Sequence, residues 1–535
     1  MAPWLTGRQA TLNYSKIGKV CSLQRGLFMN HIKIDLERTL GDIDLNIFGG
    51  FAEHLRQCIY GGIYDPDSPL ADEDGLRSNL REALQRLNMP NVRYPGGNFV
   101  SGYRWMDGVG PRQERTSQHD LAWNVVDSNQ FGTNEFIQFC RKLNIEPYLC
   151  VNCGDGDMRE AADWVEYCNG TGDTALARLR REHGFAEPHK VKYWGIGNEV
   201  DGEWQIGYKT PQEYARAANE FGKVMKWVDP DIKLIGAAVS LWEDRPVLSR
   251  RHLQRDLKSE WVERGQLILE QAGDLIDYMA LHWYVGNAKN DFNAYMTVSE
   301  LYEERLSAYE GLIRAVCLDK GIKHSIYITV DEWGIYLRSS PESPERRHYG
   351  FYALEDALVA AMNLNAFIRH AYSVKMANIA QIVNVLAPIL TRLDGLVLQT
   401  IFYPFELYSR TCGQKALDVL WYGETFAGTY LGHEYTGVRT LDVTATLDEP
   451  RKQLVVYVVN RSQTEAMETT ISLADGQFVG SVQAFLVNGP DIKAENTFEK
   501  PNQVGTREAT LEALGQSLTY SFEPHSVTAL VCAIS

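Results

Sequence analysis

Two apolar segments, far apart in the sequence, each end on a glutamate, and they constrain this chain more than any other feature. The first, Lys192–Trp204, reads KYWGIGNEVDGEW and passes from apolar residues to Asn198 and Glu199. The second, Ser325–Gly334, reads SIYITVDEWG and passes from an apolar run to Glu332. Because parallel strands of a barrel end on the same face, two such strands would bring two carboxylic acids to one site.

Strand and helix signals alternate through the first three quarters of the chain. The expected strands are residues 45–51, 91–97, 146–152, 192–199, 233–239, 278–284, 325–333 and 377–384. Between them apolar residues recur at helical spacing, for example in the leucines of residues 76–87 and in a longer helix over 353–369. The sequence Thr210-Pro211-Gln212-Glu213 is a capping box that predicts another helix start. This alternation predicts an α/β fold, a (β/α)8 TIM barrel.

The pattern changes after about residue 390. Residues 454–459 and 520–532 read as strands, and no helical period of any length is evident in this region. The segment His31–Glu37 alternates apolar and polar residues, as a strand with one wet face does. We therefore expect an N-terminal extension and strand over 1–40, a barrel over 41–390, and a β-sandwich, jelly-roll-like, over 391–535 that the N-terminal strand joins.

The composition limits the classes of partner. The chain has 535 residues, and its 53 basic and 69 acidic residues give a net charge of −16. This balance argues against nucleic acid or an anionic membrane and is compatible with a neutral sugar. No run of about 18 apolar residues predicts a membrane span. Residues 1–30 lack the apolar core of a secretory signal, so we expect a cytoplasmic protein; their basic, acid-free composition makes mitochondrial targeting a minor alternative.

The sequence contains no pattern that predicts a metal or a cofactor. Cys150 and Cys153 form one CxxC without a second pair nearby, so buried thiols are favoured over a zinc or redox site. His282 has no second His or Cys at ligand spacing and is expected to form hydrogen bonds. Pro95-Gly96-Gly97 matches no phosphate-binding motif. It is either an ordinary turn or a place where the backbone approaches a ligand closely.

Polar side chains gather at the expected carboxyl ends of the strands. Besides the two glutamates they are Glu53, Arg93, Asn98, Asn198, His282, Tyr284, Gln381 and Asn384. Polar residues within apolar strands cost free energy unless they are paired, so a set at one end of a barrel indicates an active site.

Two carboxyl groups in such a site suit the cleavage of a glycosidic bond. One protonates the leaving oxygen, and the other attacks the anomeric carbon or activates water. Glu199 suits the acid, with Asn198 placed to reach the sugar's 2-hydroxyl. Glu332 suits the nucleophile, held ionised by donors such as Arg93 and Tyr284. We expect burial and the charge of Glu332 to raise the pKa of Glu199.

At this point the motifs resemble those of the glycoside hydrolase family 51 α-L-arabinofuranosidases, of clan A. The resemblance runs from about Phe48 to Phe405 and is carried by RYPGGNFVSGYRWMDGVGP, GNEVDGEWQIG, LHWYVGN, DEWG and NIAQIVNVLAPI. Weaker matches are ENTFEKPNQV and FEPHSVTALV. The resemblance implies a retaining, exo-acting enzyme that removes terminal arabinofuranosyl residues from arabinoxylan or arabinan. It also implies a homo-oligomer, a hexamer, with a carbohydrate substrate and no cofactor.

The resemblance also implies a role for each site residue. Glu199 matches the acid/base and Glu332 the nucleophile. The positions that hold the sugar are matched by Glu53, Arg93, Asn98, Asn198, Tyr284 and Gln381, and the one that supports the carboxylates by His282.

Departures from the family pattern lie near the rim of the expected site. Arg104 and Met106 stand within a segment that usually reads GYNWEDG, Gly334 replaces the Asn of DEWN, and VNCGD replaces VNLGT. These departures affect the expected aglycone preference more than the reaction type. Two alternatives stay open: another retaining clan A glycosidase, such as an endoglucanase or xylosidase, and a catalytically silent sugar-binding protein. Retention of both Glu199 and Glu332 argues against the second.

Overall fold

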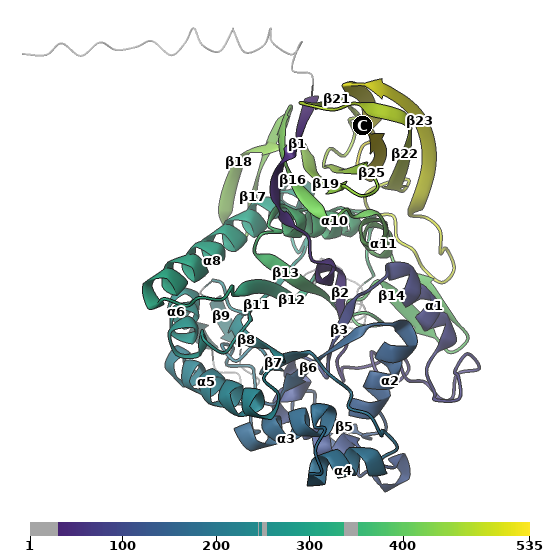
Figure 1. Ribbon diagram of the computed structural model, residues 1–535. Helices are drawn as coiled ribbons and strands as arrows, with labels where there is room; N and C mark the ends of the chain where they lie inside the picture. The colour runs from purple at the N-terminus through teal and green to yellow at the C-terminus, as the bar shows by residue number, and fades with distance from the viewer. Residues whose placement is uncertain (1–29, 244, 249–253, 336–350) are drawn as a thin grey trace, which may run out of the picture.

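The computed structural model describes residues 30–243, 245–248, 254–335 and 351–535. Figure 1 shows a barrel ringed by helices with a separate sheet domain above it. The barrel is closed by eight strands in the order β11-β12-β13-β2-β3-β6-β7-β8, and all neighbours are parallel. This confirms the expected TIM barrel.

The barrel strands and their helices follow the chain in order. The strands are β2 Gly49–Phe51, β3 Asn91–Tyr94, β6 Glu146–Val151, β7 Tyr193–Ile196, β8 Lys233–Val239, β11 Tyr278–Val285, β12 Tyr327–Ile335 and β13 Val374–Ala380. The helices are α1 Ser78–Leu87, α2 Thr133–Leu143, α3 Met158–Asn169, α4 Ala175–Glu182, α5 Pro211–Val228, α6 Trp261–Ala272, α7 Phe292–Met296, α8 Val298–Lys320 and α10 Leu354–Arg369. The capping box before α5 is confirmed, because the Thr210 hydroxyl accepts from the Glu213 N–H and the Glu213 carboxylate accepts from the Thr210 N–H.

Several barrel strands are shorter than expected. Those expected over 91–97 and 192–199 end at Tyr94 and Ile196. Where a strand over residues 45–51 was expected, a 3-10 helix, η2 Leu45–Phe48, comes first and only the short β2 follows. The Asp44 carboxylate accepts from the Asn46 N–H, which caps the turn and shortens the strand. The last strand was expected to run to residue 384, but β13 ends at Ala380. Beyond it, the Asn384 N–H bonds to the Ile389 carbonyl in a loop.

The sheet domain is one curled nine-stranded sheet to which both ends of the described chain contribute (Figure 1). Its order is β23-β22-β25-β20-β19-β16-β1-β21-β24. The bounds are β1 Asn30–Asp42, β16 Lys415–Tyr422, β19 Leu441–Asp448, β20 Gln453–Asn460, β21 Met467–Leu473, β22 Phe478–Asn488, β23 Gly505–Gly515, β24 Ser517–Phe522 and β25 Ser526–Ile534. The N-terminal strand β1 pairs antiparallel with β16 and parallel with β21, as expected for a strand that joins this domain.

Short hairpins and one helix complete the structure. The hairpins are β4 Gln118–Asp120 with β5 Val125–Asp127, β9 Arg245–Leu248 with β10 Gln254–Leu257, β14 Ile389–Arg392 with β15 Gly395–Leu398, and β17 Thr425–Tyr430 with β18 His433–Arg439. The helix α11 Phe402–Thr411 corrects the expectation that no helix follows residue 390, and five of its apolar side chains are buried. The expected domain limits at 40 and 390 stay predictions.

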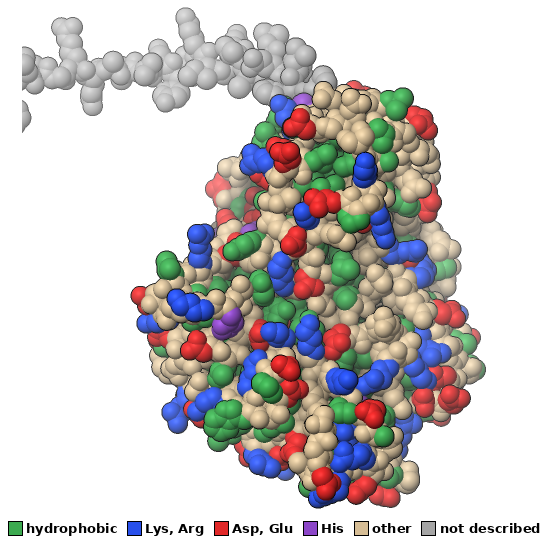
Figure 2. All heavy atoms as spheres, in the orientation of Figure 1, with side chains coloured by type: hydrophobic (Ala, Val, Ile, Leu, Met, Phe, Trp, Pro, Cys, Tyr) green, Lys and Arg blue, Asp and Glu red, His purple; other side chains and the backbone are tan. Residues whose placement is uncertain are grey.

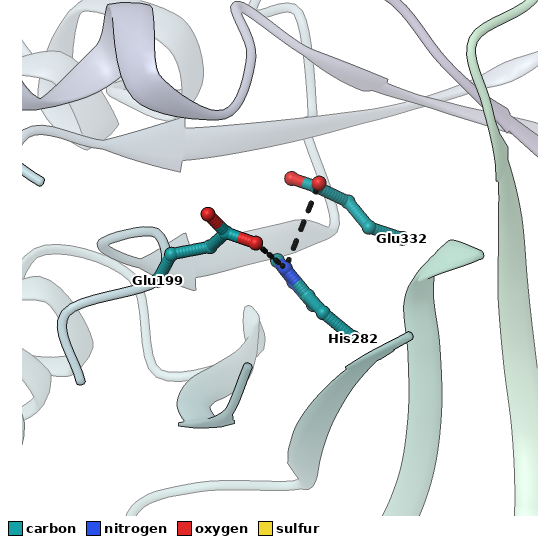
Figure 3. A group of neighbouring side chains, drawn as sticks. All are labelled: Glu199, His282 and Glu332. Atoms are coloured by element: carbon teal, nitrogen blue, oxygen red, sulfur yellow. Dashed lines mark hydrogen bonds and ion pairs between the residues drawn. The ribbon is translucent and has the colours of Figure 1, made fainter. Parts of the chain in front are cut away.

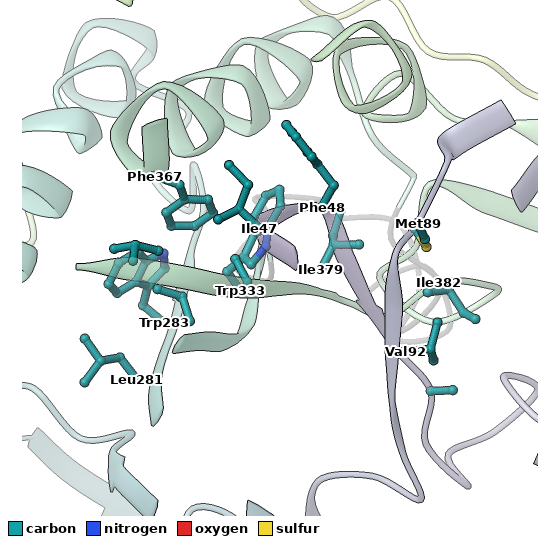
Figure 4. Close-up of a cluster of buried hydrophobic side chains, with 14 of the residues drawn as sticks. Ile47, Phe48, Met89, Val92, Leu281, Trp283, Trp333, Phe367, Ile379 and Ile382 are labelled. Atoms are coloured by element: carbon teal, nitrogen blue, oxygen red, sulfur yellow. The ribbon is translucent and has the colours of Figure 1, made fainter. Parts of the chain in front are cut away.

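Successive side chains of a barrel strand point alternately toward the surrounding helices and into the barrel. On β11, Leu281 and Trp283 point out toward the helices and join the buried cluster of Figure 4, which also contains Trp333, Phe367 and Ile379. Inside the barrel a second apolar cluster consists of Tyr148, Tyr193, Ile235, Tyr278, Ala280 and Met376. The barrel is therefore a filled core, and its site can lie only at one end.

The surface carries no strong chemical bias on the face drawn in Figure 2, where acidic, basic and apolar side chains are interspersed. Within the described ranges, no helix combines the length and the apolar character that crossing a membrane would require.

Candidate active site

An irregularity in β12 places two consecutive acidic residues in the barrel interior. Relative to β11, Ala280 pairs with Thr329 and His282 pairs with Glu332, so β12 has one extra residue in this interval. The pairing with β13 shifts at the same place. Because a bulge turns an additional side chain to the same face, both Asp331 and Glu332 contact the polar groups of the site.

Glu332 is buried and receives two strong hydrogen bonds. Arg93 Nη1 donates to Glu332 Oε1 at 2.7 Å, and the Tyr284 hydroxyl donates to Glu332 Oε2 at 2.8 Å. Burial raises the pKa of Glu332, while the charges of His282 and Arg93 act against that rise. The donors expected to hold this carboxylate, Arg93 and Tyr284, therefore do lie against it.

Glu199 lies just past the end of β7, in a left-handed backbone conformation with φ of +44°. Its Oε2 accepts from Trp204 Nε1 at 2.8 Å, and its Oε1 lies 3.2 Å from His282 Nδ1. Burial acts to raise the pKa of Glu199, but the hydrogen bond and charge of His282, with the Trp204 bond, bring it below the usual value. The expected rise in the pKa of Glu199 was wrong, because these donors outweigh burial.

His282 is the hub between the acidic groups. Its Nδ1 lies 3.2 Å from Glu199 Oε1 and 3.6 Å from Glu332 Oε2 (Figure 3). Its Nε2 lies 3.2 Å from Asp331 Oδ1. Burial opposes its charge, but the surrounding carboxylates raise the pKa of His282 to about 10. The ring is therefore an imidazolium at neutral pH. This agrees with the hydrogen-bonding role expected from the sequence.

The same three side chains could in principle hold a metal ion. One ligand atom each from Glu199, His282 and Glu332 lie within 4.8 Å of one another. A protonated imidazole has no free lone pair for a metal, and Arg93 already neutralises Glu332. The residues present therefore suit proton transfer better than metal binding.

Arg93 and Asp331 form the floor beneath the carboxylates. Arg93 Nη2 donates to Asn198 Oδ1 at 2.5 Å, and Arg93 Nε lies 3.3 Å from Asp331 Oδ2. The Tyr148 hydroxyl donates to Asp331 Oδ2 at 2.7 Å. Sequence reasoning did not place Asp331 in the site, because simple alternation turns it away from Glu332. The doublet of acids in DEW was the only signal.

Glu53 forms the opposite wall. Gln381 Nε2 donates to its Oε2 at 3.0 Å, and Trp123 Nε1 and the Phe99 N–H donate to its Oε1 at 3.1 and 3.2 Å. Burial, with the charge of Glu332, raises the pKa of Glu53 to about 8, so it is mostly protonated at neutral pH. Trp123 was not expected here. It lies in the turn of the β4–β5 hairpin, and its local sequence gave no signal.

The two glycines after Pro95 are required by close approach. A Cβ on Gly97 would lie 3.2 Å from Glu332 Oε1 and 3.4 Å from Glu53 Oε1, and a Cβ on Gly96 would lie 2.3 Å from Glu53 Cγ. Gly96 also has φ of +137°. The turn therefore exists to bring the backbone beside the carboxylates, which decides between the two interpretations left open by the sequence.

The remaining expected residues divide into two groups. Asn198 Nδ2 and Gln381 Oε1 are buried without a partner among the described residues, as groups awaiting a ligand would be. Asn98 begins the 3-10 helix η3 Asn98–Gly102 and is half-buried. Asn384 is not in the site: it bonds to the Gln57 carbonyl and to Thr391, and it holds the loop after β13 together.

Cys150 and Cys153, the cysteines of the CxxC motif, are buried thiols beside the loop that follows β7. Cys150 Sγ donates to the Gly197 carbonyl at 3.1 Å. Burial raises the pKa of Cys150 to about 12 and that of Cys153 to about 11, so neither is a thiolate at neutral pH. The eight cysteines in the described ranges are all free.

Comparison with known sequences places both parts of the chain. Residues 83–313 match the family model described as "Alpha-L-arabinofuranosidase 1 domain", and residues 331–526 match "Alpha-L-arabinofuranosidase C-terminal domain". The chain is 38% identical over 509 residues to a probable α-L-arabinofuranosidase C of Aspergillus clavatus, covering 93% of this chain and 96% of that one. It is 34% identical over 505 residues to the Bacillus subtilis intracellular exo-α-(1→5)-L-arabinofuranosidase 1, covering 92% and 97%.

Solved structures agree with the sequence comparison. The α-L-arabinofuranosidase of Thermotoga maritima, solved as an arabinose complex, superposes with a TM-score of 0.84 at 36% identity and covers 94% of this chain and 99% of that one. The GH51 enzyme of Thermotoga petrophila gives 0.83 at 36% identity, covering 94% and 99%. A bifunctional glucanase-xylanase, CelM2, shares only 13% identity at a TM-score of 0.60 over 95% and 99% of the two chains, a likeness of fold alone.

Proposed function

Since the chain belongs to the family 51 α-L-arabinofuranosidases, we propose that it releases terminal, non-reducing α-L-arabinofuranosyl residues with retention of configuration. The observation that carries this proposal is the placement of Glu199 and Glu332, which offer oxygens within 4.8 Å of each other across His282. Retaining glycosidases hold their two carboxyl groups about 5–5.5 Å apart, and inverting ones about 6.5–9.5 Å.

In the first step, Glu332 attacks the anomeric carbon and Glu199 protonates the departing oxygen. The bond to the aglycone breaks, and an ester between the sugar and Glu332 forms. Arg93 and Tyr284 orient Glu332 for the attack through bonds of 2.7 and 2.8 Å, and the charge of Arg93 favours the ionised form against burial. Glu199 must carry a proton for this step, and the acidic group beside it is the His282 imidazolium, whose Nδ1 lies 3.2 Å from Glu199 Oε1.

In the second step, water attacks the anomeric carbon and Glu199 takes a proton from it. The ester breaks, Glu332 leaves as a carboxylate, and L-arabinose departs. The charge of Glu332 is absent while the ester exists, which favours the ionised form of Glu199 when a base is needed. Two inversions at the anomeric carbon give overall retention.

The sugar would be held by the groups that now lack partners. Asn198 Nδ2 and Gln381 Oε1 are buried and unpaired within the described part of the chain. Glu53, mostly protonated at neutral pH, can donate as well as accept to a hydroxyl. Asn98 stays a proposed contact on the strength of the family resemblance.

The direct test is hydrolysis of 4-nitrophenyl α-L-arabinofuranoside followed by proton NMR of the first-formed product. We expect the α-anomer to appear first and to mutarotate later. The β-anomer appearing first would contradict retention. Turnover only of the β-D-xyloside or of cellulose would favour another clan A glycosidase, and no turnover of any substrate would favour a sugar-binding protein.

The substrate class follows the same proposal. The Bacillus subtilis relative is named for exo-action on α-(1→5) linkages. We propose arabinan- and arabinoxylan-type chains as substrates, attacked at their ends. Digestion of linear arabino-oligosaccharides should then release arabinose alone, with each oligosaccharide shortened by one residue at a time. Early release of fragments of two or more residues from a longer chain, in place of arabinose, would contradict exo-action.

The assembly and location complete the proposal. By the family resemblance, we propose that the 60.6 kDa chain forms a homo-oligomer, a hexamer. The test is light scattering coupled to gel filtration, in which the mass of a single chain would contradict the proposal. The Bacillus subtilis relative is named as intracellular. We propose the cytoplasm for this chain, and cell fractionation tests it against mitochondrial import.

A further inference from the structure

We propose that Asp201 is a positioning residue for Glu199, acting by fastening the loop that carries Glu199 to the segment that follows β8, Ser240–Trp242. This rests on the proposed role of Glu199 as acid/base. Neither Asp201 nor Ser240–Trp242 supplies a side chain to the set that contacts Glu332. Their effect would be on the placement of Glu199 relative to His282.

The loop after β7 needs such a fastening. Gly197 has φ of +79° and Glu199 φ of +44°, and a left-handed conformation is costly for a residue with a side chain. Such a conformation persists only where the surroundings over-determine it. Within the loop, the Gly202 N–H bonds to the Glu199 carbonyl at 2.9 Å, which closes one turn but does not connect it to the barrel.

Asp201 makes that connection. Its Oδ2 accepts from the Ser240 N–H at 2.7 Å and from the Leu241 N–H at 2.9 Å, and its Oδ1 accepts from the Ser240 hydroxyl. A carboxylate with three donors in a fixed arrangement is a strong and directional tie, because hydrogen bonds to an ionised group are about twice as strong as neutral ones. The tie lies two residues from Glu199.

The same segment also holds the partner of Glu199. Trp242 Nε1 donates to the His282 carbonyl at 2.9 Å, and the Ser259 hydroxyl donates to the Leu241 carbonyl at 2.6 Å. Trp242 also lies against the site-bearing strand β11, with its ring centroid 6.5 Å from that of Trp283. Ser240–Trp242 therefore links the Glu199 loop at one end and His282 at the other, across the 3.2 Å contact between them.

Packing alone does not support the loop on this side. A cavity of about 10 Å³ lies between Glu199, Asp201, the end of β8 and His282. That is about the room needed by a single water. Because no side chain fills this space, Asp201 supports the loop on the side of β8, while Arg93 and Cys150 hold it at Asn198 and Gly197.

The chain offers a matched control at the other end of the same strand. Asp277 Oδ2 accepts from the Leu234 N–H at 3.0 Å, and its Oδ1 accepts from Lys233 Nζ at 2.7 Å. Like Asp201 it is a carboxylate that binds a main-chain N–H of the β8 region. It lies at the amino end of β8 and β11, away from the carboxylates of the site.

The experiment compares Asp201→Ala and Asp277→Ala on two substrates. Arabinotriose needs a proton on its leaving oxygen, whereas 2,4-dinitrophenyl α-L-arabinofuranoside hardly does. For Asp201→Ala, which removes every acceptor of the side chain, we expect kcat/KM on arabinotriose to fall by about 10- to 100-fold, as misplacement of a catalytic group by about 1 Å does. On the dinitrophenyl substrate we expect a fall within about threefold, and turnover accelerated by azide. Asp277→Ala should leave both values unchanged.

Equal losses on both substrates, or no loss on either, would overturn the positioning role, provided that Glu199→Ala shows the dependence on leaving group. If Glu199→Ala itself shows none, it is the acid/base assignment that fails. Should Asp201→Ala not fold, Ser240→Ala removes the hydroxyl that donates to Asp201 and keeps the two main-chain bonds. In Ser240→Ala, kcat/KM should fall more on arabinotriose than on the dinitrophenyl substrate, by a smaller factor than in the Asp201 variant. An equal fall on both substrates would contradict the proposal.

Discussion

Strands β12 of the barrel and β20 of the sheet domain are both buried along almost their whole length, yet they serve opposite purposes. β20 is apolar from Leu454 to Val459, and its pairing with β19 runs in continuous register. β12 carries Asp331 and Glu332, and its register shifts against both neighbours. In a regular strand pair every residue keeps its partner on the neighbouring strand. A bulge leaves one residue unpaired and redirects the side chains beside it.

The two domains place their buried polar groups differently. In the barrel, unpaired polar atoms occur beside the carboxylates, at Asn198 and Gln381. In the sheet domain, the cluster around Leu454, Val456 and Leu530 is apolar, and the unpaired buried atoms include the hydroxyls of Thr444 on β19 and Thr528 on β25. Changes in the first region should alter kinetics with little effect on folding, and changes in the second should do the reverse.

The largest effect should come from Glu332→Ala. Loss of the nucleophile should lower kcat by more than about 10⁴-fold on natural and activated substrates alike. With azide and the dinitrophenyl substrate, the variant should form the β-azide, the inverted product. Detection of a covalent sugar–enzyme intermediate in this variant by mass spectrometry would contradict the assignment.

Glu199→Ala should separate the two carboxylates by role. We expect arabino-oligosaccharide hydrolysis to fall by about 10²- to 10⁴-fold, because an alcohol leaves poorly without a proton. Cleavage of the dinitrophenyl substrate should keep a fast first step, and azide should release the α-azide, with retained configuration. Equal loss on both substrates without azide rescue would remove Glu199 from the acid/base role.

Leu454→Ala tests the other side of the comparison. Leu454 is fully buried in β20, so its truncation should cost about 2–5 kcal/mol of unfolding free energy. The thermal midpoint should fall, while kcat and KM of the folded enzyme stay at wild-type values. A changed KM at a temperature where the variant is folded would show that the sheet domain acts on the site.

A smaller kinetic effect is expected from Gln381→Ala, with Asn384→Ala as its control from the same loop. Gln381 donates to Glu53 at 3.0 Å, and its removal leaves buried groups unpaired at a cost of about 1–3 kcal/mol. We expect kcat/KM to fall at least about tenfold. Asn384 bonds to the Gln57 carbonyl and to Thr391 rather than to the carboxylates of the site, so Asn384→Ala should lower the thermal midpoint more than the catalytic efficiency. A larger loss of catalytic efficiency in Asn384→Ala than in Gln381→Ala would contradict both assignments.

The smallest effect should be a pH dependence set by Glu53. Its pKa is raised from 4.5 to about 8 in the folded protein, so the folded state binds the proton more tightly than the unfolded chain does. The resulting stability is complete below the unfolded pKa and is lost as pH rises through about 8. Glu53→Gln stays neutral, so its thermal midpoint should fall less than that of wild type between pH 6 and 9. Parallel curves for the two proteins would show that Glu53 is ionised throughout.

Local patterns in the sequence determined much of the architecture. The capping box at Thr210 and Glu213 involves residues three apart, so it depends on nothing outside the helix it begins. The alternation of strand and helix signals predicted the barrel, and the apolar runs ending at Glu199 and Glu332 placed both at its carboxyl face, because neighbouring residues decide where a strand ends. The residues expected to bind the sugar were predicted from the family resemblance, because the periodicity of apolar residues does not identify them.

Only the tertiary structure decided the arrangement and charge of the site. The bulge that turns Asp331 inward depends on register against β11 and β13, and the approach of Trp123 to Glu53 depends on where a hairpin turn folds back. The proton on His282, and the lowered pKa of Glu199 that follows from it, depend on distances of about 3 Å between residues 83 apart in the chain. Electrostatic interactions depend on separation in space, which a sequence pattern does not contain.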